Sequence, residues 1–516
     1  MKKIILITLA LLGYSYTIAQ TEFDALKATQ TDINGTARYM SMAGAFGALG
    51  GDASAIKDNP AGLGIYRRSE IVGTLNLSFQ NTKSVWDGKS SVDNLFKVGF
   101  NNFSYIVSKP TWSNENGSTT GLLNSNWSFS YNKLRNFDRN LKINGGQSSS
   151  SLSDYMAYMT SNAESTTNKI FNGKDINYDN PDLPFLSVMG YEAFLINEEP
   201  TGWKPDLTGS EKVTPSYQSN ETGSINEYSV GWAGNFSNMF FLGASLNLQS
   251  INYNENTVYS EIFNNRFGGF SLKNSLSTSG SGVNLKIGAI VMPLDFLRLG
   301  LSVNTPTVYL LNSSYNSSIQ SNMKSNFLDS VVSGKSDNYG SYEFKLQSPV
   351  ELNLSAALIL KNKGLLSFEY DFKDYSTSKF MDNNGSSASY GNENDGMRQM
   401  LKATHTFKVG GEYKLTDNFS LRAGYAYTTS ATTLQAEKLV LYNTTRNDSE
   451  YFKHNSSKYL SAGFGYREAN WFLDFAFVNK IIDETFYPYN TNIIAVNPAK
   501  VITSNNNIVI TLGLKF

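Results

Sequence analysis

The sequence contains no cysteine, only two histidines and few charged side chains for its length. Without cysteine, a disulfide scaffold, a thiol nucleophile and thiolate metal sites are excluded. Charged residues make up 17% of the 516 residues, below the roughly 25% of an average soluble domain. The net charge is −1, so nucleic acid is not indicated as a partner. Beyond the N-terminal leader, no apolar run reaches the roughly 18 residues of a membrane-spanning helix.

The first residues have the pattern of a secretory signal peptide. Lys2 and Lys3 precede the apolar stretch Ile4–Leu12, and Thr17-Ile18-Ala19 has small residues at a cleavage position before Gln20. We therefore expect residues 1–19 to be a signal peptide that exports the chain. Aromatic residues make up 13% of the sequence. An exported chain that is rich in aromatic residues and lacks helical spans is typical of an outer-membrane β-barrel.

Alternating apolar and polar residues predict the strands of such a barrel. Leu421, Ala423, Tyr425 and Tyr427, for example, alternate with polar or small residues. This pattern, at about ten residues a strand, suits a membrane-crossing strand. About fourteen strands are expected, near residues 70–80, 98–108, 125–135, 225–235, 239–253, 281–292, 297–311, 349–360, 365–374, 404–414, 419–429, 457–467, 471–480 and 507–516.

The connections between these strands alternate in length, which favours a membrane barrel over a soluble sandwich. Short turns are expected on the periplasmic side and long loops outside the cell. The long loops would span residues 81–97, 136–224, 254–280, 312–348, 375–403, 430–456 and 481–506. The connection 109–124 is the exception, because it should be short and is not. The last strand ends in Phe516, which resembles the signal read by the outer-membrane insertion machinery.

A compact segment of small residues, Ala43–Arg68, lies between the leader and the first strand. Its glycines allow close backbone packing, and Asp52 precedes a short helical piece. Asn59 can cap a new turn that begins at Pro60. We expect this segment to pack through Gly44, Phe46, Gly47, Gly50 and Asp52, with Asn59-Pro60-Ala61 as its central motif.

The run from Asp52 to Leu63, with Asn59-Pro60-Ala61 inside it, resembles the N-terminal hatch of the FadL/OmpP1/TodX family of outer-membrane transporters, in a Bacteroidetes-type member. Three later segments, 283–307, 348–379 and 404–428, resemble hairpins of the same family. The resemblance implies an all-β fold: a transmembrane antiparallel barrel of about 14 strands, plugged by its N-terminus. It divides the chain into a signal peptide (1–19), a hatch (20–69) and a barrel (70–516) with its largest outer loop at 136–224.

The resemblance also implies a function. The family passes hydrophobic molecules, such as long-chain fatty acids or aromatic hydrocarbons, across the outer membrane without a cofactor. The expected partners are a hydrophobic ligand, outer-membrane lipid and the insertion machinery, and the protein is expected to be a monomer. The family's lateral exit uses a kinked third strand. In this chain that strand, Trp127–Arg135, has no interior glycine or proline to mark a kink. The sequence therefore does not establish a lateral exit here.

Polar residues of the predicted strands could hold the hatch in the lumen. Glu369, Lys408 and Glu412 face the lumen if the strand registers hold, and Arg67 and Arg68 follow the hatch motif. The two arginines either pair with lumen carboxylates or end the plug at the periplasmic rim.

The long loop 136–224 contains two stretches that are compatible with helices, 152–163 and 185–195. Their apolar side chains either cap the barrel mouth or form a groove for a hydrophobic ligand. The groove residues would be Met156, Met159, Phe185, Met189 and Phe194.

No arrangement of residues indicates an enzyme, a metal site or a cofactor. His405 and His454 are far apart in the sequence, and the two Gly-Lys-Ser triplets lack the earlier glycine of a phosphate-binding loop. No catalytic or metal-binding residues are therefore expected. A second hypothesis remains beside transport: a barrel of this kind could serve as a shuttle or anchor for secreted proteins. The sequence does not distinguish the two.

Overall fold

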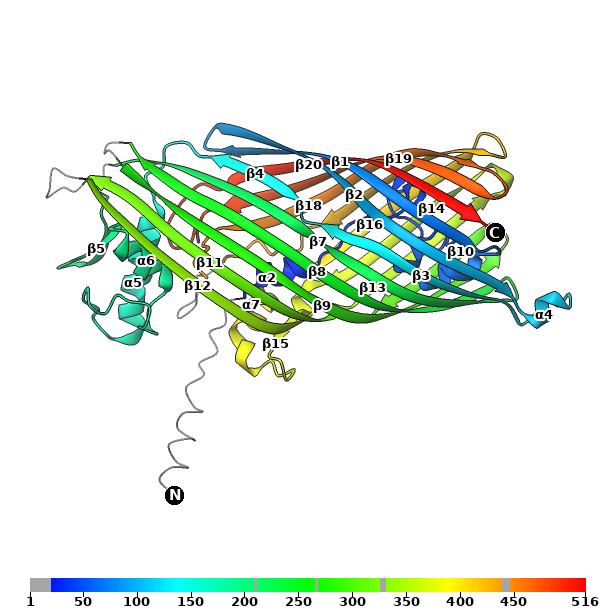
Figure 1. Cartoon of the computed structure of the whole chain (residues 1–516), viewed down its shortest axis with the longest axis horizontal. Helices are drawn as coiled ribbons and strands as arrows, with labels where there is room; N and C mark the ends of the chain where they lie inside the picture. The colour runs from blue at the N-terminus through cyan, green and yellow to red at the C-terminus, as the bar shows by residue number, and fades with distance from the viewer. Residues whose placement is uncertain (1–19, 208–210, 265–267, 325–330, 439–445) are drawn as a thin grey trace, which may run out of the picture.

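The computed structural model describes residues 20–207, 211–264, 268–324, 331–438 and 446–516, so the expected signal peptide lies outside the described residues. Eighteen strands form one antiparallel sheet. The sheet closes on itself because the last strand, β20 (Ala499–Lys515), pairs with the first, β1 (Glu70–Trp86). The result is an elongated barrel (Figure 1). No helix among the described residues is both long enough and apolar enough to cross a membrane.

The eighteen strands make fourteen staves, because four staves are each built from two strands. These are β3 (Leu122–Asn136) with β4 (Arg139–Asn144), β10 (Leu297–Asn304) with β11 (Val308–Lys324), β12 (Val331–Gln347) with β13 (Glu351–Leu360), and β14 (Gly364–Asp374) with β15 (Lys379–Met381). Pro306 and Pro349 lie in two of the interruptions, where a residue without an N–H cannot donate to the ladder. The predicted barrel of about 14 strands is confirmed.

The other ten staves are single strands. They are β1, β2 (Lys89–Pro110), β7 (Val213–Phe236), β8 (Phe240–Phe263), β9 (Gly268–Leu294), β16 (Ala403–Lys414), β17 (Phe419–Thr429), β18 (Tyr451–Arg467), β19 (Trp471–Tyr487) and β20. A separate two-stranded sheet joins β5 (Ile196–Glu199) to β6 (Gly202–Pro205).

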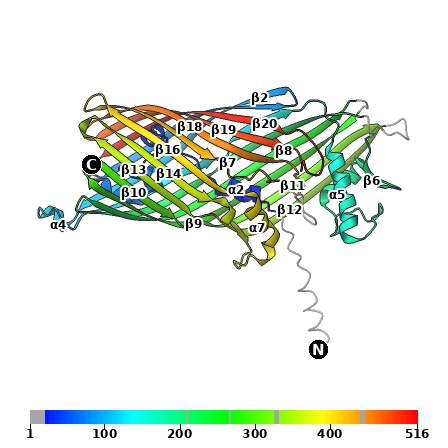
Figure 2. The same ribbon diagram turned by 180° about the vertical axis from the view of Figure 1, so that it is seen from behind.

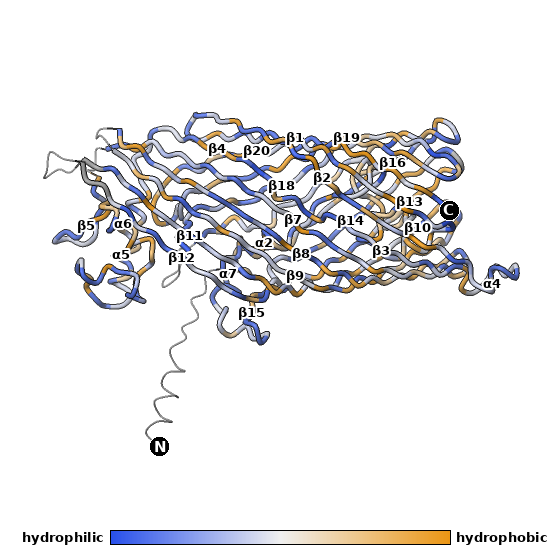
Figure 3. The backbone as a smooth tube through the Cα atoms, viewed as in Figure 1, coloured by the Kyte–Doolittle hydropathy of each residue, from blue (hydrophilic) through white to orange (hydrophobic). Residues whose placement is uncertain are grey.

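Alternation along the strands places apolar side chains outside and polar ones inside. In β20, for example, Ile510, Leu512 and Leu514 are exposed while Val509 and Thr511 are buried. Hydrophobic residues gather toward the end of the barrel that carries the C-terminus (Figure 3). We call this end, which also carries the short turns, the turn end and the opposite end the loop end. An apolar outer band of this kind is what a bilayer requires.

Several segments predicted as long loops are in fact strands. Residues 81–97 belong to a hairpin that turns at Asp87-Gly88, and the predicted loops 254–280 and 312–348 are mostly paired strands. The predicted loop 136–224 narrows to 145–212, because β4 and the first half of β7 pair with each other. These extensions lie beyond the apolar band. Their outer side chains are mostly polar, while apolar side chains such as Tyr259, Leu272 and Tyr315 are buried on the inner face, the reverse of the arrangement in the apolar band.

The N-terminal segment lies inside the barrel (Figures 1 and 2). It contains α2 (Glu22–Thr29), α3 (Ala37–Ser41) and the 3-10 turns η1 (Ala55–Lys57) and η2 (Pro60–Ile65). Most of its residues are buried. The remaining helices belong to connections: α4 (Trp112–Glu115) at the turn end, α5 (Leu152–Thr167), α6 (Phe185–Glu192), α7 (Gly391–Met400), η3 (Lys361–Lys363), η4 (Tyr375–Thr377) and η5 (Ala388–Tyr390).

The fold predicts which end of the barrel faces the periplasm. Because the chain has no cysteine, single cysteines can replace the exposed residues Asn116 and Asp417 at the turn end and Lys174 and Asn384 in loop-end connections. With a membrane-impermeant maleimide on intact cells, we expect labelling only at Lys174→Cys and Asn384→Cys. The cysteine-free parent is the blank. Labelling of Asp417→Cys but not Lys174→Cys would show that the turn end, and not the loop end, faces the outside of the cell.

Candidate functional site

The Asn59-Pro60-Ala61 motif joins two segments of the hatch to each other and to the wall. Asn59 caps η2, because its Oδ1 accepts a hydrogen bond from the Ala61 N–H at 3.0 Å, and Pro60 takes the first position of that turn. The Asn59 amide donates to the carbonyl of Gly47 at 2.7 Å and to that of Ala289 in β9 at 3.3 Å. One side chain therefore caps a turn, closes the hatch and touches the barrel.

Asp52 has a similar role in the preceding turn. Its carboxylate accepts hydrogen bonds from the Thr36 hydroxyl at 2.8 and 2.9 Å and from the Ser54 N–H at 2.9 Å. The Ser54 hydroxyl in turn accepts from the Thr36 N–H. Gly50 lies so close to Gly62 that a Cβ on Gly50 would be 2.7 Å from the Gly62 Cα, and its φ of +58° also favours glycine. The hatch is thus held in one shape by its own polar groups.

Two ionic groups fix the hatch to the wall. Glu369 of β14 accepts hydrogen bonds from the N–H groups of Phe46 at 2.9 Å and Gly47 at 2.6 Å, and it pairs with Lys408 of β16 at 2.7 Å. Arg38 of α3 pairs with Glu412 of β16 at 2.8 Å. Glu412 also binds Arg422 at 2.6 Å, and Arg422 binds Asp474 at 2.6 Å. The structure therefore brings Glu369, Lys408 and Glu412 to the hatch or beside it.

Arg67 and Arg68 lie at the rim of the turn end instead of among the lumen carboxylates. Arg67 donates to the Asn238 side chain at 2.9 Å and to the Gly64 carbonyl at 2.8 Å. Arg68 donates to the carbonyl of Ala469 at 2.6 Å and to the Asn470 side chain at 2.9 Å. Of the two interpretations from the sequence, this geometry matches the one in which they end the plug at the rim.

The wall carries glycine where the hatch touches it. A Cβ on Gly243 would be 2.5 Å from the Pro60 carbonyl carbon, and one on Gly300 would be 2.7 Å from the Gly47 carbonyl oxygen. Gly410 and Gly424 lie equally close to Met42. The hatch backbone therefore packs directly on the strand backbone. The sequence contained these glycines, but nothing in it indicated what they face.

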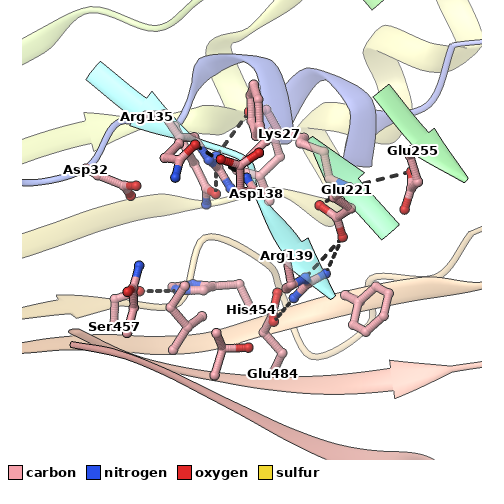
Figure 4. Close-up of a pocket in the computed structure, with 18 of the residues that line it drawn as sticks. Lys27, Asp32, Arg135, Asp138, Arg139, Glu221, Glu255, His454, Ser457 and Glu484 are labelled. Atoms are coloured by element: carbon pink, nitrogen blue, oxygen red, sulfur yellow. Dashed lines mark hydrogen bonds and ion pairs between the residues drawn. The ribbon is translucent and has the colours of Figure 1, made fainter. Parts of the chain in front are cut away.

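A cavity of about 260 Å³ lies beside the first helix of the hatch, between α2 and the wall. Its lining is charged, and many of the charges are paired (Figure 4). Arg139 binds Glu221 at 2.6 Å and Glu484 at 2.6 Å. Lys27 of α2 lies 3.4 Å from Glu221, and Lys480 binds Asp32 at 2.6 Å. The sequence did not predict this group, because its members come from distant strands and only their registers bring them together.

The histidines take no part in a catalytic arrangement that the described residues show. His454 lies at the cavity with its Nε2 2.8 Å from the Ser457 hydroxyl (Figure 4). His405 lies elsewhere and contacts the Tyr370 hydroxyl at 2.8 Å. Within the described ranges, no three side chains of histidine, cysteine, aspartate or glutamate are grouped so that they could hold a metal ion.

The wall of the barrel is open beside this cavity, between β2 and β3. The two strands pair only from Asn102–Pro110 to Asn124–Asn132. Beyond that point residues 89–100 of β2 pair with β1 alone, and β3 and β4 pair with β7 alone. The strand β4 steps to the inner side. There Ser84 of β1 donates to the Lys142 carbonyl of β4 at 2.7 Å, and Gln80 donates to the carbonyl of Asp138, just before β4, at 3.1 Å. The pairing of β2 with β3 ends at Asn102 and Asn132 although residues 127–135 contain no glycine or proline, and β3 also shifts its register against β7 between Lys133 and Arg135.

The residues of the predicted outer-loop groove are mostly packed into a core. Met156, Met159 and Met189 are buried, Phe185 is nearly so, and Phe194 is exposed. The predicted helices there are confirmed as α5 and α6. In this arrangement the apolar side chains contact one another and the loop-end strands, as the capping interpretation expected.

A second connection at the loop end reaches the hatch. Arg446 pairs with Asp24 of α2 at 3.1 Å and with Asp448 at 2.6 Å. The neighbouring Glu450 is buried, and its carboxylate accepts from the Thr257 hydroxyl at 3.1 Å. Burial, together with the negative charge of Asp448, raises the pKa of Glu450 to about 7.

The hatch geometry predicts that Gly47→Ala loosens the plug. The new Cβ would lie 2.5 Å from the Asn353 side chain and 2.9 Å from the Glu369 carboxylate, so the anchor must shift. We expect a local cost of about 1–3 kcal/mol, measured as faster hydrogen exchange in residues 37–66. Gly73→Ala is the control, because nothing lies within 4 Å of its Cβ. Equal protection in the two variants would show that Glu369 does not anchor the hatch.

The raised pKa of Glu450 predicts that the contact between this connection and α2 weakens with pH. A carboxyl whose folded pKa lies above its unfolded value of 4.5 stabilises the fold below that value, and this contribution is lost as pH rises through about 7. Exchange of α2 and residues 446–450, corrected for intrinsic rates, should therefore be faster at pH 8 than at pH 5.5. Glu450→Gln should remove the part of the difference that Glu450 causes; burial also raises the pKa of Glu22 in α2 to about 7, so a remainder is expected there. A pH response unchanged in that variant would assign it to another group.

Comparison with known proteins agrees with this geometry. A family model described as outer membrane protein transport protein (OMPP1/FadL/TodX) matches residues 224–485, half of the chain. No curated protein sequence matches. Similar solved structures include a Pseudomonas aeruginosa FadL homologue, with 12% identity, a TM-score of 0.53 and coverage of 95% of this chain and 100% of that one. The Pseudomonas putida toluene transporter TodX has 12% identity and a TM-score of 0.50, with 94% and 99% covered.

A TodX deltaS2S3 mutant, described as a monoaromatic hydrocarbon channel, has 13% identity and a TM-score of 0.51 over 94% and 99% of the two chains. At such identities the likeness shows the fold, a plugged antiparallel barrel. The family model adds evidence of family membership, which a shared fold alone does not give, because it matches half of the amino-acid sequence. The chain belongs to the OMPP1/FadL/TodX family of outer-membrane transport proteins.

Proposed function

We propose that this protein lets hydrophobic small molecules cross the outer membrane by passive diffusion, gated by the ligand, through the opening between β2 and β3. The observation that carries the proposal is a lumen closed by the hatch at the turn end and open through the wall beside a cavity. Lipid-facing residues flank the opening, because Phe96, Val98 and Phe100 of β2 are all exposed. A molecule in the cavity can therefore pass into lipid without entering water.

A lateral route is physically favoured because an apolar solute has a lower free energy in lipid than in water. An apolar solute gains about 25 cal/mol for each Å² that leaves water, so a water-filled exit at the turn end would oppose release. The hatch closes that exit through Glu369 and Arg38, while the wall offers lipid directly. No energy source or cofactor is needed for this diffusion.

The proposed substrates are long-chain fatty acids or aromatic hydrocarbons. The similar structures support this range, since TodX is described as a toluene transporter and another as a FadL homologue. We also propose that residues 1–19 are a signal peptide and that the remainder divides into a hatch and a barrel at about residue 69. The sheet closes on itself from β20 to β1, which favours a monomer. Membership of a Bacteroidetes-type group stays a prediction.

Phe516 is proposed as the insertion signal. It is exposed, its ring stacks on Tyr105 with centroids 6.2 Å apart, and its N–H donates to the Ser69 carbonyl. Its side chain therefore faces lipid at the turn end, where a machinery that reads the last strand could reach it.

Blocking the opening tests the route. A Cβ on Gly99 would meet only the Lys133 ammonium at 3.5 Å and the Asn76 carbonyl at 4.0 Å, so a side chain can begin there without a clash, and we expect the indole of Gly99→Trp to occupy the gap. In a strain that lacks the wild-type gene, we expect this variant to reduce uptake of labelled dodecanoate and toluene several-fold. Gly73→Trp, on the open outer surface of β1, should not.

The comparison needs equal amounts of protein in the membrane, checked by the heat-modifiable mobility of the folded barrel. Uptake by wild type that does not exceed that of the deletion strain would refute transport. In that case, a secreted protein retained on wild type and lost from the deletion strain would favour the shuttle or anchor instead.

A further inference from the structure

The opening differs in charge from the cavity behind it. In the cavity, Arg139, Lys480 and Arg446 each bind a carboxylate at 3.1 Å or less. On the β2 and β3 side of the same cavity, three cations have a single carboxylate of the described residues within ion-pair distance. These are Lys97 of β2 with Lys133 and Arg135 of β3, and the carboxylate is that of Asp138.

The three cations are poorly neutralised. Lys97 lies 3.9 Å from Asp138, at the limit of an ion pair, and 43% of its side chain is exposed. Arg135 donates to neutral oxygens, the Lys27 carbonyl and the Gln30 side chain, both at 3.0 Å. For Lys133 the described residues provide no hydrogen bond and no ion pair. The opening therefore carries a local excess of positive charge.

The ammonium of Lys133 lies within the opening itself. It is 3.5 Å from where a Cβ on Gly99 would be, so the side chain reaches from β3 across to β2. On the outer surface next to this gap, Phe100 stacks on Tyr131 with ring centroids 5.9 Å apart, and Val98 is 64% exposed. A cationic inner rim thus adjoins an apolar outer face.

We propose that this rim selects ligands by charge, with Lys133, Arg135 and Lys97 binding the anionic head group of an amphiphile whose tail lies against Val98 and Phe100. The inference rests on the proposed function and narrows its substrate class. An anion that leaves water is costly unless cations and hydrogen bonds receive it, and the opening provides both. A neutral hydrocarbon gains little from these groups. The head group is a carboxylate or a phosphate, because both match ammonium and guanidinium donors.

Chain-matched probes separate charge from hydrophobicity. Uptake of labelled dodecanoate, dodecyl phosphate and 1-dodecanol is measured at pH 7.5 in the deletion strain that carries each variant. We expect Lys133→Met to lower uptake of the two anions roughly tenfold, the loss of one charged hydrogen bond, and to leave dodecanol within twofold. Lys133→Glu should lower it further, and Lys133→Arg should restore it. Lys109→Met is the control, a solvent-exposed lysine at the turn end of β2.

The outcomes discriminate among explanations. If uptake of dodecanol falls together with uptake of the anions, Lys133 only supports the structure of the wall. If uptake of the anions is unchanged, the Lys133 ammonium is only hydrated and binds no ligand. Either result overturns the proposal. Wild type that carries none of the three probes overturns the proposed function instead. If Lys133→Met does not reach the membrane folded, Lys97→Met replaces it, with the same expected split between anions and alcohol.

A bilayer phospholipid could supply the same phosphate chemistry as an external ligand. Mass spectrometry of lipid bound to purified wild type and Lys133→Met, after incubation with phosphatidylglycerol vesicles, separates the sources. Loss of bound phospholipid in the variant together with loss of dodecanoate uptake supports a site that external ligands share. Loss of phospholipid with unchanged dodecanoate uptake assigns the rim to bilayer lipid and overturns its role in substrate selection.

Discussion

A chain that crosses lipid with strands must satisfy every backbone N–H and C=O group through the neighbouring strand, because the hydrocarbon offers no partner. In this barrel the requirement is met around most of the circumference, and β20 closes the ladder onto β1. It is relaxed between β2 and β3. There β4 turns inward, and side chains such as Gln80 and Ser84 take over as donors to carbonyls that a strand would otherwise bind. The wall can open because those carbonyls are satisfied from inside.

The same constraint explains the chemistry of the hatch. A plug with little regular structure brings many unpaired backbone groups into the lumen, and each must find a partner there. Glu369 supplies one, since its carboxylate accepts two successive N–H groups of the hatch, and Lys408 balances its charge. Asn59 supplies another by serving both a turn and the wall. Glycines of the wall, such as Gly300, let the two backbones approach closely enough for these bonds to form.

How much of this could be read from the sequence depends on whether a feature is local. The turn at Pro60 was predictable, because a cap and a proline act on their own neighbours. Strands in the apolar band were predictable because lipid imposes alternation, as in β17, whose bounds are those predicted. The hairpin β11–β12 was not, since most of its outer face is polar and its apolar residues, such as Tyr315 and Phe344, point inward. Long-range features, such as Arg139 between Glu221 and Glu484, depend on registers that no single segment encodes.

The opening combines these two kinds of information. The end of pairing between β2 and β3 leaves no trace in the residue types of β3, so the residues of β3 alone do not predict the unpaired stretch that the structure has there. Lys133 itself stands next in line after Trp127, Phe129 and Tyr131 on the lipid-facing side of β3. A charged residue in that row is costly when the neighbouring strand is paired, because the ammonium would face hydrocarbon. Because β2 no longer pairs with β3 from residue 101 back to residue 89, the side chain can enter the gap and reach the lumen. The break in the ladder therefore lowers the cost of placing a lysine in this row, because the ammonium can leave the hydrocarbon through the gap.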